Sequence, residues 1–462
     1  MKVCIAVLLT ILIISCNKLI DVGDPGNSVI GKKVFSHDTS ALSAVSGIYS
    51  KIMVSFPNIL NAGISICAGL SADEIQPNNS GNSMTEFYTN TISTQSSFNR
   101  IYLWYYGYTL IYQTNACIEG IVNSNKLSED VSNQLLGEVY FFRALIYFQM
   151  IQLYGNVPLV VSTNYEDNAR LKRTETNVIF SQIKEDLLKA SGLLSENYPS
   201  NGRVRVNRWA SKALLAKIYL YGGDWIDAES ASGQVINAGP YLLEKDFNRV
   251  FLYDSKEAIL QLLPTDNGYN TSEAAQFVPN PSGTSLPQYS LTAYLLNTFE
   301  PGDKRFINWI GKKTVNGITY TFPYKYKVRP NFGPTFAVTE YNMVLRLAEQ
   351  YLIRAEARAH LSNLTGAIAD IDSIRKRAGL PLIAVTNPGI TYNELLLAIQ
   401  KERMVELFTE WGNRWFDLKR TQTAVSVLAN RKAGWRDVDT LYPVPEAEIK
   451  LNPNLIQNPG YN

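Results

Sequence analysis

The segment NQLLGEVYFFRALIYFQMIQLYGNVPLV limits the possible folds more than any other part of the chain. From Leu135 to Tyr154 it is apolar on nearly every side, and a helix without a polar face belongs in the core of a large protein. Glu138 and Arg143 interrupt the apolar residues, so we expect both to be paired inside that core. The Gly-Asn-Val-Pro sequence after Tyr154 ends the predicted helix.

Two helical hairpins of matched spacing lie further along the chain. The segment RWASKALLAKIYLYGGDWIDAESASGQVINAG is typical of two helices joined at Gly-Gly-Asp, and LRLAEQYLIRAEARAHLSNLTGAIADIDSIRKRAGLP is typical of a second pair. The separation of Ala216 from Ala228 equals that of Ala355 from Ala367. Small residues at such positions let paired helices approach closely, as in tetratricopeptide repeats.

Two more helices are expected around residues 104–122 and 178–194. The chain shows no regular alternation of strands and helices, so a β-α-β architecture is not expected. We therefore predict a mainly α fold class, a tetratricopeptide-like scaffold of helical pairs with a loop-rich ligand-binding half.

The amino terminus resembles a secretion signal with an anchor point. Lys2 precedes a run of mostly apolar residues from Val3 to Ile14, which suits the hydrophobic part of a signal peptide. The run is shorter than the ~20 residues that a membrane-spanning helix needs. The pair Ser15-Cys16 resembles a bacterial lipobox, in which the leader is cleaved before the cysteine and the cysteine is acylated. An ordinary signal peptide or a buried strand are the alternatives.

The residues after Cys16 predict a tether and then a folded body. They are rich in Gly, Asp, Asn and Lys as far as Lys33, which is typical of a flexible spacer. We assign residues 1–15 to the signal peptide, 16–33 to the lipidated cysteine and tether, and 34–462 to the body. The body divides into an N-terminal part with helical pairs, 34–250, and a C-terminal part, 251–462.

Charge and cysteine content exclude some classes of function. The formal net charge is +2 and the basic residues are scattered, so no nucleic-acid partner is expected. Once the leader is removed and Cys16 is acylated, only Cys67 and Cys117 remain for the fold. They either pair or stay as two buried thiols. The 27 tyrosines outnumber the 18 phenylalanines, which suits wet binding surfaces as well as half-buried helix packing.

Catalytic patterns are scarce. The only histidines, His37 and His360, have no second His or Cys at ligand spacing, so we predict no metal site. No GxSxG motif occurs, and GNSVIGKK places Lys33 where a phosphate loop needs Ser or Thr. We predict no cofactor and no enzymatic activity.

One helix carries a pattern that resembles an active site. After a predicted capping box at Thr391 and Glu394, the residues Glu402, Glu406 and Glu410 recur every four positions. A glycosidase places its two carboxylates on either side of the substrate, whereas one helix face points them the same way. We therefore favour an ion-pair network beneath Trp415-Phe416, with a surface glycosidase as the alternative. The charged residues nearby are Arg403, Arg414, Asp417, Lys419 and Arg420, and the cations among them could neutralise the glutamates.

Two polar stretches differ from the helical segments. Residues 264–336 are rich in Gly, Pro and Asn with interleaved Tyr and Phe, and 71–90 is a shorter stretch of similar character. Long irregular segments in compact proteins are usually functional or disordered, and this many aromatics argue against disorder. We expect ligand contact from at least one of the two stretches, and irregular surface cover is the alternative.

At the C-terminal half the sequence becomes familiar. ERMVELFTEWGNRWFDLKRT closely resembles the C-terminal signature of the SusD/RagB family of outer-membrane nutrient-binding lipoproteins. GEVYFFRALIYFQMIQLYGNVPLV, the RAEA helix that ends in RAGLP, and LYPVPEAEIKLNPNLIQNPGY are similar to further segments of that family, in the same order. The segments VFSHDTSALSAVSGIYSKI and SADE resemble its N-terminal part.

This resemblance implies a function. It implies a lipid-anchored protein on the extracellular side of the outer membrane that binds glycan, or in some members peptide, without catalysis. It implies delivery of that ligand to a TonB-dependent (SusC-like) β-barrel transporter. A helical scaffold that contacts only protein partners is the remaining alternative.

The resemblance also implies where ligand contacts lie, namely after SADE and in the loops before the second hairpin. In the first region we predict Asp73, Asn79, Phe87 and Tyr88 as candidates. In the second region the candidates are Tyr269, Phe277 and Phe332.

Overall fold

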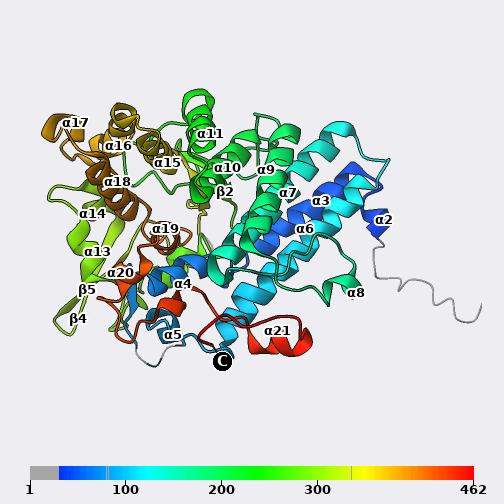
Figure 1. The fold of residues 1–462 in the computed structure, drawn as a ribbon, viewed down its shortest axis with the longest axis horizontal. Coiled ribbons are helices and arrows are strands. Elements are labelled where there is room, and N and C mark those ends of the chain that lie inside the picture. Colours follow the sequence, from blue (N-terminus) through cyan, green and yellow to red (C-terminus); the bar gives the residue numbers. More distant parts are fainter. Residues whose placement is uncertain (1–30, 80, 82, 334–335, 462) are drawn as a thin grey trace, which may run out of the picture.

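The computed structural model describes residues 31–79, 81, 83–333 and 336–461. The body is mainly helical, as predicted (Figure 1), and α7 (Glu129–Tyr154) is the longest of the described helices and is almost entirely buried from Leu135 onward. Gly155 follows α7 with a φ of +69°, a conformation that glycine adopts without strain. Both charged residues in the buried part of α7 are paired, as expected. Glu138 lies 2.6 Å from Arg205, and Arg143 lies 2.7 Å from Asp186.

The predicted helical pairs are confirmed, and they stack side by side along the molecule (Figure 1). α7 contacts α6 and α9, α9 contacts α10, and α10 pairs with α11. α11 then packs on α15, so the two hairpins are neighbours in space although they are far apart in sequence. The bounds are α6 (Tyr106–Val122), α9 (Thr176–Leu193), α10 (Arg208–Gly222), α11 (Trp225–Ala238), α15 (Leu347–His360), α16 (Leu364–Ala378) and α18 (Tyr392–Leu407).

Three small antiparallel sheets tie the irregular segments to this scaffold. β1 (Ile75–Pro77) pairs with β3 (Tyr289–Leu291), and Gln76 lies opposite Ser290. β2 (Ala258–Leu262) pairs with β6 (Asn342–Arg346), and both strands are fully buried. β4 (Ile310–Val315) and β5 (Ile318–Pro323) form a hairpin around Asn316-Gly317. Both turn residues have positive φ, which a two-residue hairpin turn of this kind requires.

Residues 264–336 are therefore less irregular than their composition predicts. The stretch contains β3, β4, β5 and three short helices. The remaining elements are α2 (Gly31–Val34), α3 (Asp38–Ile52), α4 (Gly63–Ser71), α5 (Thr85–Tyr88), the π-helical η1 (Asn99–Tyr105), α8 (Tyr165–Asn168), α12 (Ser272–Phe277), α13 (Ala293–Thr298), α14 (Lys304–Trp309), α17 (Ile383–Thr386), α19 (Asn413–Arg420), α20 (Ala424–Leu428), the 3₁₀ helix η2 (Asp437–Thr440) and α21 (Glu446–Leu451).

The beginning of the body differs slightly from the prediction. Residues 31–33, which we assigned to the tether, belong to α2. Cys16, the signal peptide and the rest of the tether lie outside the described residues. Cys67 and Cys117 are buried free thiols, which decides between the two alternatives for these cysteines. Among the described helices, none combines the length and the apolar character needed to cross a membrane.

Candidate functional site

Five aromatic side chains form two contacting groups, and polar contacts hold the segments of the two groups together. We call Phe98, Tyr102, Phe56, Tyr269 and Phe332 the aromatic row. The ring centres of Phe98 and Tyr102 are 4.9 Å apart, and those of Tyr102 and Phe56 are 5.5 Å apart. Tyr269 and Phe332 meet edge to face at 5.8 Å. Phe332 is 76% exposed and Phe56 is 39% exposed, so these two rings offer the most free surface.

The first three rings come from local structure that sequence reasoning did not single out. Phe56 precedes a proline in the short connection between α3 and α4. Tyr102 lies in η1, whose π-helical turn is wider than an α-helical one. Such turns are rare and occur often at functional sites. Tyr105, also in η1, is 60% exposed close to the row. Neither the Phe-Pro pair at Phe56 nor the sequence of η1 indicates that Phe56 and Tyr102 will lie in contact.

The other two rings stand on neighbouring loops. Gly268 has a φ of +79°, and a Cβ atom at this position would collide with the ring of Phe332. The backbone amide of Asn331 donates to the carbonyl oxygen of Gly268 at 2.8 Å. Glycine at position 268 therefore lets the loop of Tyr269 lie directly against the loop of Phe332.

Polar contacts connect the two groups of rings. The Oδ2 atom of Asp266 accepts a hydrogen bond of 2.6 Å from the backbone amide of Ser55, the residue before Phe56. Thr265 donates to the carbonyl oxygen of Met53 at 3.3 Å. The side chain of Asn267, beside this contact, is exposed. Aromatic faces with neighbouring amide and carboxylate groups suit a ligand that carries both apolar faces and hydroxyl groups.

Asp73, a predicted ligand contact, is buried in an ion-pair cluster. Its two carboxylate oxygens accept from Arg414 at 2.8 and 2.9 Å, and Arg431 is a further partner. Burial alone would raise the pKa of Asp73, but the hydrogen bonds and charges of these arginines hold it below its ordinary value. The observed role of Asp73 is to join α4 to α19 and to the segment after it.

The other predicted candidates differ in how much surface they offer. Phe87 is fully buried and Phe277 is 4% exposed, so both rings pack in the core. Tyr88 is half-buried beside Lys432, whose ammonium lies 4.9 Å from the ring centre. Asn79 is exposed, and its side-chain oxygen accepts from the backbone of Gly81. Ligand contact by these residues stays a prediction, and for Asp73, Phe87 and Phe277 the structure gives no free surface that would serve it.

The three regularly spaced glutamates form the predicted ion-pair network. The predicted capping box at Thr391 and Glu394 is present. Glu402 and Glu406 lie on α18, whereas Glu410 lies beyond its end, so the three do not share one helical face. Arg305 lies 2.7 Å from Glu402 and 2.9 Å from Glu406.

The predicted partners of this network were wrong. Arg346 contacts Glu406 at 2.6 Å and Glu410 at 2.8 Å, and Lys325 contacts Glu410 at 2.5 Å. Burial would raise the pKa of Glu406, but Arg377, Arg346 and Arg305 hold it well below its ordinary value. The residues named from sequence instead pair elsewhere, and Asp417 accepts from Arg403 and Arg420. Of the two carboxylates that resemble a glycosidase pair, Glu406 is thus held ionised by arginines, whereas burial raises the pKa of Glu402 despite its contacts with Arg305 and Arg375.

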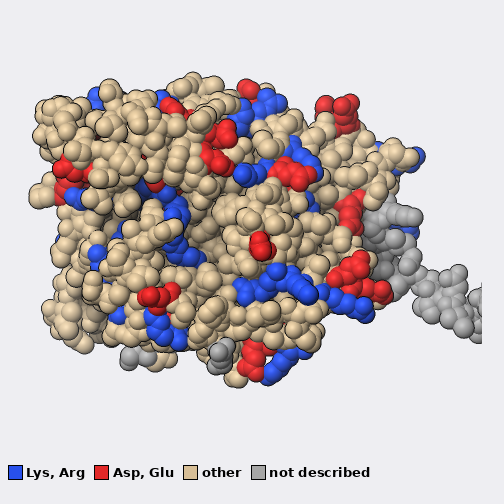
Figure 2. Space-filling model, in the orientation of Figure 1, with Lys and Arg blue, Asp and Glu red and all other residues tan. Residues whose placement is uncertain are grey.

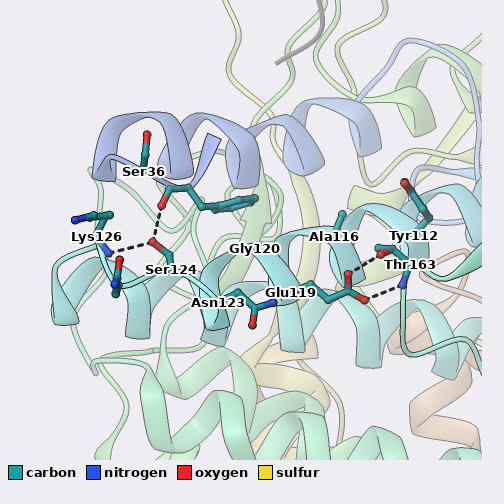
Figure 3. Close-up of a pocket in the computed structure, with 11 residues that line it drawn as sticks. Ser36, Tyr112, Ala116, Glu119, Gly120, Asn123, Ser124, Lys126 and Thr163 are labelled. Carbon is teal, nitrogen blue, oxygen red and sulfur yellow. Dashed lines mark hydrogen bonds between the residues drawn. The ribbon is translucent and has the colours of Figure 1, made fainter. Parts of the chain in front are cut away.

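A separate pocket of about 480 Å³ lies between α2 and α6 (Figure 3). Its polar groups satisfy one another, because Glu119 accepts from the backbone amide of Thr163 at 2.7 Å and Ser124 donates to the carbonyl oxygen of Phe35 at 2.5 Å. Gly120 leaves room for the ring of Phe35, which a Cβ atom there would overlap. The contacts of Phe35 with Gly120 and Ser124 thus hold the end of α2 against α6. Within the described residues, no cluster of three or more His, Cys, Asp or Glu side chains is arranged to hold a metal ion.

Comparisons with known proteins identify the family. A model described as "SusD family" matches residues 310–461, and a second, described as "Starch-binding associating with outer membrane", matches residues 54–220. The chain belongs to the SusD family. It is 23% identical to the SusD-like protein P25 of Formosa agariphila, over 97% of this chain and 96% of that protein.

Solved structures of SusD proteins share the fold. A SusD superfamily protein from Bacteroides vulgatus superimposes with a TM-score of 0.78 at 21% identity, over 92% of this chain and 99% of that one. A structure described as a laminarin-binding SusD-like protein has a TM-score of 0.76 at 23% identity, with the same coverage. At these identities the structures establish the SusD fold and not the ligand.

Proposed function

We propose that this protein binds oligosaccharides at the cell surface and delivers them to an outer-membrane transporter of the TonB-dependent type. The observation that carries the proposal is the aromatic row, two of whose rings, Tyr269 and Phe332, lie in a loop region expected to hold ligand. Membership of the SusD family supports it, because one matching family model is described as starch-binding and associated with the outer membrane. A structural relative described as laminarin-binding supports the ligand class.

The row suggests a mechanism of capture without chemistry. The apolar face of a sugar ring can stack on an aromatic side chain. Phe332 and Phe56 present exposed aromatic rings for such stacking. The hydroxyl groups of the sugar would be satisfied by Asn267 and other polar groups between the rings. Because the rings lie on several short loops rather than in a closed cavity, the site favours a chain that runs across a surface.

The anchor and the partner belong to the same proposal. Acylation at Cys16 would hold the body at the membrane, since several acyl chains give stable attachment where one does not. Residues 16–30 would then act as the tether, with the body beginning at Gly31. Mass spectrometry of Cys16 from the native host tests the anchor, and co-purification with a β-barrel transporter tests the partner.

A ligand screen by calorimetry tests the binding function. Laminarin and starch oligosaccharides and short peptides are titrated into the wild-type body and into Phe332→Ala and Tyr269→Ala. We expect an oligosaccharide to bind, and each variant to weaken it about fivefold or more, the effect of losing a contact worth ~1 kcal/mol. Tyr165→Ala is the matched control, because Tyr165 is 75% exposed and lies outside the row.

The outcomes separate the alternatives. Binding of peptides but not of oligosaccharides, with the same two variants weakened, would favour a peptide-binding SusD protein. Absence of any ligand, with the transporter still co-purifying, would favour the scaffold without a small ligand. Equal binding by wild type, Phe332→Ala and Tyr269→Ala would place the site away from the row.

A further inference from the structure

A second pocket, distinct from the aromatic row, has an unusual charge. It has a volume of about 580 Å³ and lies between the end of α7, the start of α9, α19 and the C-terminal segment. Its lining includes the cations Arg173, Lys419 and Arg420, and no Asp or Glu among the described residues. Figure 2 shows basic side chains beside a hollow near the middle of one face, in the region where Figure 1 draws α19. We call this the cationic pocket.

Two of the three cations have no acidic partner in the described structure. Arg420 is neutralised, because it contacts Glu356 at 2.6 Å and Asp417 at 2.7 Å. Arg173 donates only to neutral oxygens, including the backbone carbonyl of Asn156 at 2.7 Å and the side chain of Asn458 at 2.6 Å.

Lys419 is the least satisfied of the three. Its ammonium group donates to the carbonyl oxygen of Gln152, which is its only hydrogen-bond partner in the described structure. An ammonium group has three donors, so two of them remain available. Burial lowers the pKa of Lys419 to about 7, and no neighbouring carboxylate opposes that shift.

Capping of α7 accounts for part of this arrangement. The last carbonyl groups of a helix lack partners within the helix. Lys419 donates to the carbonyl oxygen of Gln152, and Arg173 donates to that of Tyr154. A helix C-terminus carries the equivalent of about half a negative charge. Arg173 and the protonated form of Lys419 face it, so the pocket keeps an excess of positive charge that capping does not remove.

The rest of the lining suits a sugar ring. Phe180 and Tyr221 supply aromatic surface, and Asn156 and Thr176 supply amide and hydroxyl groups. A pocket of this size is within the range for small-molecule sites, and it is ample for one saccharide unit.

We propose that the cationic pocket binds an acidic saccharide unit, with its carboxylate or sulfate group held by Lys419 and Arg173. The ligand anion replaces the missing acidic partner, and charge-assisted hydrogen bonds to an oxyanion are among the strongest that a side chain makes. The inference shares with the proposed function only the ligand class, because it concerns a different pocket.

Calorimetry with matched sugars tests the site. Galacturonate, galactose and inorganic sulfate are titrated into the full mature protein, into Lys419→Met and into Lys376→Met. Lys376 is exposed on α16 and serves as the control for loss of one positive charge. We expect galacturonate to bind, galactose not to bind, and Lys419→Met to weaken galacturonate roughly tenfold or more, the effect of one charge-assisted hydrogen bond.

A labelling experiment keeps the test valid if Lys419→Met fails to fold. Wild-type protein is treated with an amine-acylating reagent, and modification of Lys419 and Lys376 is mapped by mass spectrometry. Galacturonate should protect Lys419 at least severalfold and leave Lys376 unchanged. Equal labelling of Lys419 with and without galacturonate would overturn the proposal.

The remaining outcomes are equally decisive. Sulfate that binds as tightly as galacturonate would show a general oxyanion site and overturn the saccharide assignment. Galacturonate binding that survives Lys419→Met but is lost in Phe332→Ala would place acidic sugars on the aromatic row and overturn the second site. Loss of oligosaccharide binding in Phe332→Ala, with galacturonate binding intact, would support two separate sites.

Discussion

Replacement of Arg346 by methionine tests how much the buried ion-pair network stabilises the C-terminal part of the fold. Arg346 is 1% exposed and comes from β6, whereas its acidic partners are the residue just before β2, a residue of α18 and one beyond the end of α18. Its guanidinium contacts Glu406 at 2.6 Å, Glu410 at 2.8 Å and Glu257 at 2.9 Å. Methionine fills much of the same volume without the charge, so the variant isolates the electrostatic contribution.

The expected cost follows from what remains around the three carboxylates. Removing one partner of a buried ion pair typically costs about 3–5 kcal/mol, because the other charge stays buried without compensation. Here each carboxylate keeps at least one other cation, since Arg377 contacts both Glu257 and Glu406, and Lys325 contacts Glu410. We therefore expect Arg346→Met to lower the free energy of unfolding by about 3 kcal/mol, a large share of the 5–15 kcal/mol typical of a folded protein.

Urea unfolding, followed by circular dichroism, measures this cost. Lys189→Met is the control, because Lys189 forms an ion pair of 2.6 Å with Glu185 on the surface of α9 and should cost less than about 0.5 kcal/mol. The double variant Arg346→Met/Glu410→Gln should recover part of the loss, since it removes one of the uncompensated charges. A loss below about 1 kcal/mol in Arg346→Met, or an equal loss in Lys189→Met, would refute this reasoning.

Three further predictions concern individual positions. Burial raises the pKa of Glu74 to about 8, so the folded protein keeps a proton that the unfolded chain loses near pH 4.5. Stability should therefore fall as pH rises from about 5 to 8, and Glu74→Gln should flatten that fall by up to roughly 4 kcal/mol in pH-dependent urea unfolding. Gly120→Ala should lower the melting temperature, since its methyl group would displace Phe35 at a cost of about 1–3 kcal/mol. Gly47→Ala, with open space at the same kind of helical position, should instead raise the melting temperature. Thr391→Ala should cost about 1 kcal/mol in thermal unfolding through loss of the capping box, and Thr391→Ser should keep most of that stability.

The candidate site could be predicted from sequence only as a pair of regions. Tyr269 and Phe332 were found because aromatics stood out in a Gly- and Pro-rich stretch, and they do lie together. Phe87 and Phe277 stood out for the same reason, yet both are buried. An irregular segment has no period from which to tell an inward side chain from an outward one. Phe56 and Tyr102 gave no signal, because their contact arises only when η1 packs beside the connection from α3 to α4.

Local pattern determined much of the scaffold. Three features depend on residues within a few turns of one another. They are the start of α18 at a capping box, the end of α7 before Gly155, and the two alanine-lined hairpins. Such signals act over short distances, so a sequence contains them in full. The partners of the buried charges were decided by tertiary structure alone. Glu406 meets Arg305 and Arg346, which are distant in sequence, because the fold brings α14 and β6 within side-chain reach of α18. The attraction between two charges depends on their distance in space and not on their separation in sequence. Which charges pair is therefore decided by how the elements that carry them are buried together.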